Sequence, residues 1–374
     1  MTRPLFSYSE PGTACHGFWE AMILAHVRSL FPAATGPEGL ISCFDHLISD
    51  DCLRRKLILK GGPGVGKSTF MRRIHAALGS DTQSTLYFCS GDPDSLDAVA
   101  FPDRGLLILD GTAPHIIDPQ IPGARDSLIN LGECLNEKAL RPRLSQIRSV
   151  MAEHAACLSR ARACLCAALP MIRNNARIIS DAADDGRLRR LTHALITAVL
   201  SGTPAQAAPH AAVRPVITDA VTAKGELCLL AEGEQQRVIR LTGHDSTDFT
   251  PVLRALSRAA QASSLAVEEH LSPRLPGGLL HVSIPALHTL ITTSARLPSE
   301  MTFDLASCIP QGNLLRRECM LEQGRASISL HISRAVAALA AAKEVHDELE
   351  SFYVPNMDFS AWQKRLDETL DSLC

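Results

Sequence analysis

Residues 61–68 carry the side chains whose types and spacing most directly indicate chemistry. They read Gly-Gly-Pro-Gly-Val-Gly-Lys-Ser and match the pattern G-x-x-x-x-G-K-[ST] in full. Glycines permit positive φ and let backbone N–H groups approach phosphate oxygens. We therefore expect Lys67 to contact the β- and γ-phosphates of ATP, and the Ser68 hydroxyl to bind Mg²⁺. The residues expected to hold the nucleotide are Gly62, Pro63, Gly64, Val65, Gly66, Lys67, Ser68 and Thr69.

The sequence around this glycine-rich loop (residues 61–68) predicts a strand before it and a helix after it. Residues 55–59 form a short, mostly apolar run, and apolar residues recur at helical spacing over residues 70–78. The N-terminus of such a helix directs its dipole and its free N–H groups at a bound anion. A plain glycine turn is the alternative, but such a turn would not require the lysine.

Two further apolar strands are expected, at residues 85–89 and 105–109. Strands that alternate with helical segments predict an α/β fold, with a parallel sheet that is covered by helices on both faces. Ligands of such sheets bind beyond the carboxyl ends of the strands. The glycine-rich loop and the segments that follow residues 89 and 109 should therefore meet at one edge.

Asp110 ends the third of these strands and is expected to support Mg²⁺, directly or through water. A turn aspartate is the alternative interpretation. Many ATP-hydrolysing proteins place a glutamate after this aspartate to orient water, but Gly111 stands there in this chain. The sequence therefore predicts slow hydrolysis or a base that comes from another segment.

Asp92 and Asp94 follow the second strand and are the first candidates for that base. Asp92 could orient water, or either carboxylate could take the proton of an acceptor hydroxyl in a kinase reaction. The alternative is a turn that leads into a capped helix. His115 and Asp118 are further candidates, although a polar loop explains them equally well. Lys67, Asp92 and Asp110 are the predicted catalytic residues.

The composition allows two domains in 374 residues, and a formal net charge of -3 indicates neither nucleic acid nor an anionic membrane as a partner. The sequence predicts no apolar run long enough to span a bilayer, and the first residues lack a signal-peptide pattern. Twelve cysteines without a C-x-x-C pair favour a reduced, cytoplasmic protein. Core packing explains Cys164 and Cys166 more simply than a metal site does.

Two long helices are expected, one over residues 150–169 that ends at Pro170, and one over residues 327–350. His346 and Glu350 are four residues apart and could bind a metal, but surface pairing is the simpler explanation. The cluster Arg187, Arg189 and Arg190 opens another helix, either as phosphate-facing lid residues or as a solvated face.

Residues 209–374 resemble a degenerate copy of residues 1–208, and these two ranges are the predicted domains. Residues 55–59 align with residues 237–241, Lys67 with Phe249, and Ser68 with Thr250. Thr293 would stand where the first copy has Asp110. Without the lysine and most of the glycines, the second copy should not bind a triphosphate in the same way. An unrelated α/β domain is the alternative, with a linker near residues 201–209.

Several motifs resemble those of a poorly characterised bacterial family of tandem P-loop ATPase-like proteins. These motifs are residues 92–97, residues 110–115, and the tail segments 346–350 and 353–359. The resemblance implies a duplicated P-loop NTPase fold and ATP binding, but it implies no known substrate. The chain departs from the family at residues 244–249, where relatives keep a better second loop.

Together these features predict an ATP- and Mg²⁺-binding P-loop protein with slow or partner-stimulated hydrolysis at one site. A kinase that acts on an unknown acceptor and a non-hydrolysing nucleotide switch are the alternatives. The expected partners are ATP and either a protein activator or an acceptor.

Overall fold

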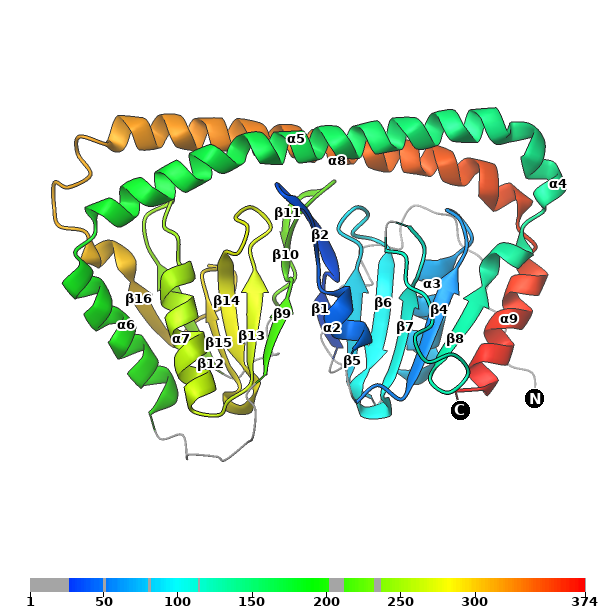
Figure 1. Cartoon of the computed structure of the whole chain (residues 1–374), viewed down its shortest axis with the longest axis horizontal. Helices are drawn as coiled ribbons and strands as arrows, with labels where there is room; N and C mark the ends of the chain where they lie inside the picture. The colour runs from blue at the N-terminus through cyan, green and yellow to red at the C-terminus, as the bar shows by residue number, and fades with distance from the viewer. Residues whose placement is uncertain are drawn as a thin grey trace.

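The computed structural model describes residues 27–49, 52–79, 82–113, 115–201, 212–231 and 237–373. These residues form two lobes that lie side by side beneath a pair of long helices (Figure 1). Each lobe is built on a six-stranded sheet. The linker expected at residues 201–209 lies outside the described residues, except for Ser201.

The sheet of the first lobe has the strand order β1-β5-β6-β7-β4-β8. Its strands are β1 (Val27–Leu30), β5 (Ser84–Phe88), β6 (Leu96–Phe101), β7 (Leu106–Asp110), β4 (Arg55–Lys60) and β8 (Asp126–Asn130). The pairs β1–β5, β4–β7 and β4–β8 are parallel, whereas β6 runs antiparallel to both of its neighbours. The expectation of a wholly parallel sheet was therefore wrong at β6. The seven residues between β5 and β6 are too few for the crossover that a parallel return needs.

The sheet of the second lobe repeats this arrangement strand for strand, in the order β9-β13-β14-β15-β12-β16. Its strands are β9 (Val213–Val216), β13 (Val267–Leu271), β14 (Leu279–Ile284), β15 (Thr289–Thr292), β12 (Arg237–Thr242) and β16 (Met301–Asp304). Here too only the central strand, β14, is antiparallel to both neighbours. The two lobes also agree in the turns before β7 and β15, where Gly105 and His288 adopt positive φ of 57° and 46°. The chain is thus α/β with two mixed sheets of the kind that duplication of one α/β unit would give.

The two long helices, α5 (Leu144–Ala182) and α8 (Glu318–Tyr353), pack along one another and bridge both lobes (Figure 1). After α5 the chain forms α6 (Asp185–Leu200), which packs on α7 (Thr250–Ala262) of the second lobe. After α8 it returns to the first lobe as α9 (Phe359–Asp371), which packs on α3 (Lys67–Leu78). Each half therefore supplies its last helix to the core of the other lobe.

Helix α5 continues through Pro170 to Ala182, although the sequence predicted an end at Pro170. A proline inside a helix costs about 3 kcal/mol because it removes one hydrogen bond and crowds the preceding turn. Pro170 lies on the exposed face, while Leu165 before it and Ile179 after it are buried. Packing on both sides of the proline outweighs its local preference. Helix α8 begins at Glu318, nine residues before its expected start.

The lobes meet through a contact between equivalent residues. Phe31 follows directly after β1 and Ile217 directly after β9, and the Phe31 amide donates to the Ile217 carbonyl at 2.8 Å. Beside this bridge the Arg28 guanidinium binds both carboxylate oxygens of Glu268, at 2.9 and 2.6 Å. Contact between equivalent residues is what a local twofold relation between the lobes would give.

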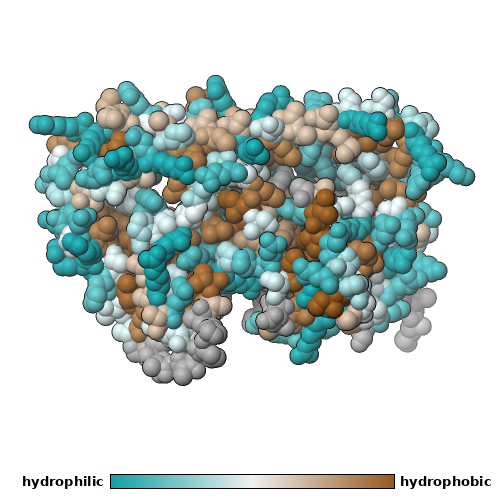
Figure 2. Space-filling model, in the orientation of Figure 1, coloured by the Kyte–Doolittle hydropathy of each residue, from teal (hydrophilic) through white to brown (hydrophobic). Residues whose placement is uncertain are grey.

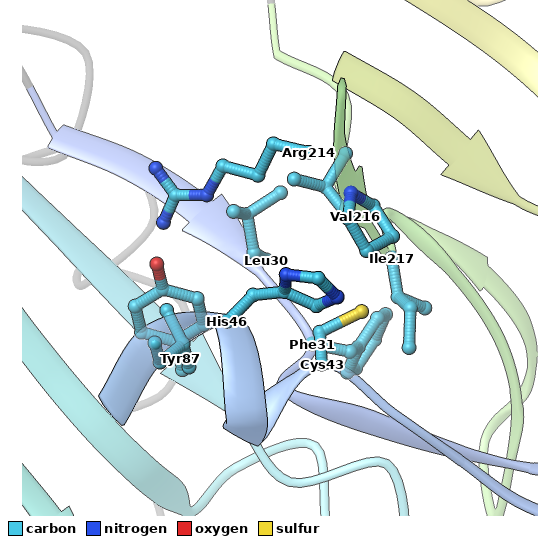
Figure 3. Close-up of a pocket in the computed structure, with 10 residues that line it drawn as sticks. Leu30, Phe31, Cys43, His46, Tyr87, Arg214, Val216 and Ile217 are labelled. Carbon is cyan, nitrogen blue, oxygen red and sulfur yellow. The ribbon is translucent and has the colours of Figure 1, made fainter. Parts of the chain in front are cut away.

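Figure 3 shows a small cavity at this junction, with Tyr87 and His46 from the first lobe and Arg214 from the second. Its volume of about 10 Å³ holds no more than one water molecule. The junction is therefore closely packed, and this cavity is no ligand site.

One helical stretch, Glu137–Ala182, is long and apolar enough by composition to cross a membrane, contrary to the expectation from sequence. In the structure its main part, α5, lies against α8 and a β-hairpin of the first lobe. Hydrophilic side chains cover much of the visible face, and hydrophobic ones gather below the helix pair near the middle (Figure 2). The structure has the character of a soluble domain, and the cytoplasmic location stays a prediction.

Candidate functional site

The glycine-rich loop joins β4 to α3 in the first lobe, as its flanking sequence predicted. Gly61, Gly64 and Gly66 have φ of 150°, 71° and 80°. A Cβ on Gly61 would come within 2.6 Å of the buried Val65 side chain. Glycine is therefore required at Gly61 both by its backbone conformation and by the available space.

The Lys67 ammonium lies between this loop and the end of β7. Its Nζ donates to the carbonyl oxygens of Gly61 and Gly62, both at 2.9 Å. The Asp110 Oδ2 atom lies 3.5 Å from the same Nζ. The structure thus brings together Lys67 and Asp110, which the sequence had placed on separate segments.

The Ser68 hydroxyl also has a role in the fold. Its Oγ accepts a hydrogen bond from the Leu96 amide, at the start of β6, at 2.9 Å. In the second lobe the Thr250 hydroxyl accepts from the Leu279 amide in the same way, at 3.0 Å. This contact alone explains a hydroxyl at both positions. The presence of Ser68 by itself is therefore no evidence for a metal site, and its position beside Lys67 and Asp110 is needed as well.

Asp110 ends β7, and its other oxygen, Oδ1, accepts from the Thr112 amide at 2.8 Å. The neighbouring Gly111 carbonyl accepts from the Lys60 ammonium at 2.8 Å, and Lys60 also pairs with Asp118 at 2.9 Å. Asp118 is therefore held at the margin of the site by Lys60, away from Lys67.

The His115 ring packs on Phe44, with centroids 4.6 Å apart, and burial lowers its pKa. This packing gives His115 a structural explanation, which differs from the polar loop that the sequence offered as the alternative.

Asp97 is the carboxylate that sequence reasoning did not select as a site residue. It lies on β6, the strand that was not predicted. Burial, reinforced by the negative charge of Asp110, raises the pKa of Asp97 to about 7. A carboxyl group with a pKa near neutrality can both accept and release a proton under ordinary conditions. An acid within the otherwise apolar run 96–101 is the signal that could have indicated it.

Asp92 and Asp94 lie in the tight turn between β5 and β6. Asp92 accepts from the Ser95 hydroxyl at 2.8 Å and lies 3.8 Å from the Lys343 ammonium of α8. Asp94 instead binds Lys224 of the second lobe, at 2.7 and 2.6 Å to its two oxygens. The turn interpretation is thus confirmed, but the turn leads into a strand and not into a helix. Both carboxylates already have cationic partners.

The end of α8 and the start of α9 cover the glycine-rich loop. The Glu350 carboxylate accepts from the Gly64 amide at 3.1 Å, and the side chains of Tyr353 and Val354 lie next to Gly62 and Gly64. His346 lies 3.5 Å from Glu350, and its hydrogen bond lowers the Glu350 pKa. The sequence had explained this pair as helix surface, whereas the structure places it at the loop.

Trp362 of α9 completes this cover. Its indole Nε1 lies 3.2 Å from the position of a Cβ on Gly66, and the ring packs edge-on against Phe70. The Nε1 donor is buried and has no hydrogen-bond partner among the described residues. We call Glu350, Tyr353, Val354 and Trp362 the C-terminal cover.

The corresponding segment of the second lobe, residues 243–250, lacks the loop's chemistry. Phe249 stands where the first lobe has Lys67, and helix α7 begins at the next residue, Thr250. The registers of β7 and β15 on their partner strands align Thr293 with Asp110. Next to Thr247 and Asp248 lies a hollow of about 360 Å³, bordered by Arg173 and Arg177 of α5.

Three other residue groups from the sequence lie elsewhere. The cluster Arg187, Arg189 and Arg190 lies on α6 of the second lobe, at the opposite end of the molecule from the loop, so it forms no lid there (Figure 1). Cys166 donates to the Pro37 carbonyl. Within the described residues, neither Cys164 and Cys166 nor His346 and Glu350 belong to a group of three metal-binding side chains.

Comparisons with known proteins gave no family. No model of a known protein family matches this chain, and neither the curated proteins nor the solved structures contain a significant match. The family suggested by the sequence motifs therefore stays a prediction. Function has to be inferred from the geometry of the site itself.

Proposed function

We propose that the first lobe binds ATP with Mg²⁺ at the glycine-rich loop and hydrolyses it slowly until a partner moves the C-terminal cover. The observation that carries this proposal is the position of Lys67. Its ammonium lies 2.9 Å from two loop carbonyls and 3.5 Å from Asp110, at the N-terminus of α3. A cation, a helix N-terminus and a carboxylate close together suit a triphosphate with its metal.

The donor set of the site fits Mg²⁺. Magnesium takes hard oxygen ligands and keeps several waters, so one hydroxyl and one carboxylate suffice to position it. Ser68 would offer its remaining lone pair, and Asp110 its Oδ2 atom, once Lys67 turns toward the phosphates. Bound Mg²⁺ would neutralise charge on the phosphate oxygens.

Asp97 is the residue that we propose to accept the proton of the attacking water. It replaces Asp92 in this role, because Asp92 is engaged by Ser95 and Lys343 whereas the pKa of Asp97 lies near 7. No glutamate follows Asp110, so the chain relies on a base from the neighbouring strand. A carboxyl group with a pKa near the working pH suits this role.

The C-terminal cover supports regulation by a partner. The Glu350 carboxylate accepts from the Gly64 amide, the kind of donor that phosphate oxygens use in such loops. A triphosphate would meet this negative charge, so ATP binding and the position of Glu350 are coupled. This contact also supports the alternative of a nucleotide switch that a partner reads at α8 and α9.

The kinase alternative has less support. Asp92 and Asp94 were its candidate bases, and both form ion pairs, with Lys343 and Lys224. The tandem P-loop ATPase-like family and the P-loop NTPase fold remain part of this proposal on the strength of the sequence motifs.

ATP consumption tests the enzymatic part. Full-length protein with Mg²⁺ should release phosphate slowly, and cell extract depleted of its own ATPases should accelerate it. Lys67→Ala should abolish turnover in both conditions, whereas Lys138→Ala, an exposed lysine on the same lobe, should not change it. Equal turnover by the wild type and Lys67→Ala would overturn the proposal, and binding without turnover in every condition would leave the switch.

A further inference from the structure

A second group of chemically active side chains lies in the other lobe, away from the glycine-rich loop. Asp219 of β10 (Asp219–Thr222), Cys228 of β11 (Gly225–Cys228) and His281 of β14 converge there. One donor atom from each lies within 4.8 Å of the other two. Carboxylate oxygen, thiolate sulfur and imidazole nitrogen are the donor types that bind Zn²⁺ in proteins.

The backbone fixes the geometry of the three donors. Asp219 and Cys228 are directly opposite one another in the antiparallel hairpin β10–β11. The His281 Nε2 atom lies 3.0 Å from the Asp219 Oδ2 atom. Two such ligands of a tetrahedral zinc ion are separated by about 3.3 Å, given metal–ligand distances of about 2.0 Å. Small shifts of the side chains would therefore suffice to admit the ion.

Hydrogen bonds to the outer atoms hold these ligands in place. The other ring nitrogen of His281, Nδ1, lies 2.8 Å from the Thr292 hydroxyl. The Thr218 hydroxyl donates to Asp219 at 2.8 Å and lies 3.1 Å from the buried His270 ring. Metal-binding histidines and carboxylates are commonly oriented by partners of this kind.

The first lobe shows that the fold does not require these residues. In its hairpin of β2 (Ala33–Gly36) and β3 (Gly39–Ser42), the positions of Asp219 and Cys228 are occupied by Ala33 and Ser42, which also face one another. The registers of β6 on β7 and of β14 on β15 align Ala98 with His281. The first lobe thus forms the same architecture without a carboxylate, thiol or imidazole at these positions, whereas the second lobe has all three groups.

We propose that Asp219, Cys228 and His281 bind a zinc-type divalent transition-metal ion in the second lobe. Three protein ligands leave one tetrahedral position for water. The sulfur ligand makes the site selective for zinc-type ions over Mg²⁺ and Ca²⁺. The site is separate from the proposed nucleotide site and does not depend on it.

Cobalt(II) provides the optical probe, because a thiolate ligand gives it a charge-transfer absorption. Metal-free, full-length protein should develop this absorption with one equivalent of Co²⁺, and one equivalent of Zn²⁺ should remove it. Cys228→Ser should lose the absorption, whereas Cys319→Ser, which alters an exposed cysteine on α8, should retain it. Absence of the absorption in the wild type, or its persistence in Cys228→Ser, would overturn the proposal.

A second variant keeps the test independent of the stability of Cys228→Ser. In a competition assay with a chromophoric chelator, Asp219→Asn should weaken Zn²⁺ binding at least about tenfold while circular dichroism stays unchanged. The control is Asp103→Asn, an exposed aspartate of the first lobe. Equal zinc affinity in the wild type and Asp219→Asn would contradict the assignment of Asp219 as a ligand.

Discussion

Asp97 lowers the stability of the folded protein at neutral pH, and the same raised pKa suits its proposed role as a base. Burial and the charge of Asp110 raise the pKa of Asp97 to about 7, well above the usual value of an aspartate. In the folded state the carboxylate is therefore disfavoured. The pKa of Asp97 is higher in the folded than in the unfolded state. The carboxylate therefore destabilises the fold by almost nothing below pH 4, by more as the pH rises, and by its full amount above about pH 7.

Replacement of Asp97 by asparagine should therefore stabilise the protein at pH 8 by roughly 1–4 kcal/mol, given about 1.4 kcal/mol per pKa unit. The gain should be close to zero at pH 4. Urea unfolding at both pH values measures it, and Asp103→Asn is the exposed control. A gain that is the same at both pH values would show that the Asp97 carboxyl titrates normally.

The same residue sets the expected pH dependence of turnover. A general base must be ionised, so phosphate release should rise with pH and level off above a midpoint near pH 7. Asp97→Asn should lower the plateau by about 100-fold or more, and Asp92→Asn should have a much smaller effect. A wild-type profile retained in Asp97→Asn would assign the base elsewhere.

At the scale of elements, the end of α8 contacts the glycine-rich loop. Its Glu350 places a negative charge next to the Gly64 amide. Glu350→Gln removes that charge but keeps an oxygen that can accept from the Gly64 amide, so it should tighten ATP binding about threefold to tenfold, or about 0.7–1.4 kcal/mol, by relieving charge repulsion. Calorimetric titration measures the affinity, with the exposed Glu348→Gln as the control. Weaker binding in Glu350→Gln would mean that Glu350 helps to hold the nucleotide.

The elements also show what the sequence could predict. Strands β4, β5 and β7, helix α3 and the loop between β4 and α3 follow from apolar runs and from the glycine pattern. Strand β6 was missed because a short turn, and not a helix, connects it to β5. The end of α5 was misplaced because local proline chemistry is weaker than packing against α8.

The candidate site was predictable only in its local part. Lys67, Ser68 and Asp110 belong to one lobe and follow motifs with fixed spacing. Glu350 and Trp362 reach the loop from the other end of the chain, through helices whose tertiary course no local pattern encodes. The importance of Asp97 depends on its burial, which the sequence alone does not specify.

At the scale of the whole molecule, the halves exchange their last helices. Trp362 and Leu366 of α9 belong to the core of the first lobe, and Leu195 and Val199 of α6 to that of the second. Each lobe thus buries apolar side chains that come from the other half of the sequence. Burial of one such side chain contributes about 1.5–3 kcal/mol. Among the described residues, neither half of the sequence supplies the whole core of one lobe.

Residues 1–208 expressed alone should therefore aggregate or unfold, whereas co-expression with residues 209–374 should give a folded one-to-one complex. Light scattering after gel filtration distinguishes these outcomes. A monomeric, cooperatively folding fragment 1–208 would contradict the exchange of helices between the halves.

The most direct test of the proposed nucleotide site is equilibrium titration of ATP, with Mg²⁺ present, into the full-length protein. We predict one binding site per chain. Lys67→Ala should weaken the affinity about 10- to 100-fold, because charge-assisted hydrogen bonds contribute about 1.5–3 kcal/mol. Lys138→Ala should bind as the wild type does. No binding by the wild type, or equal affinity in Lys67→Ala, would contradict the assignment of the glycine-rich loop as an ATP site.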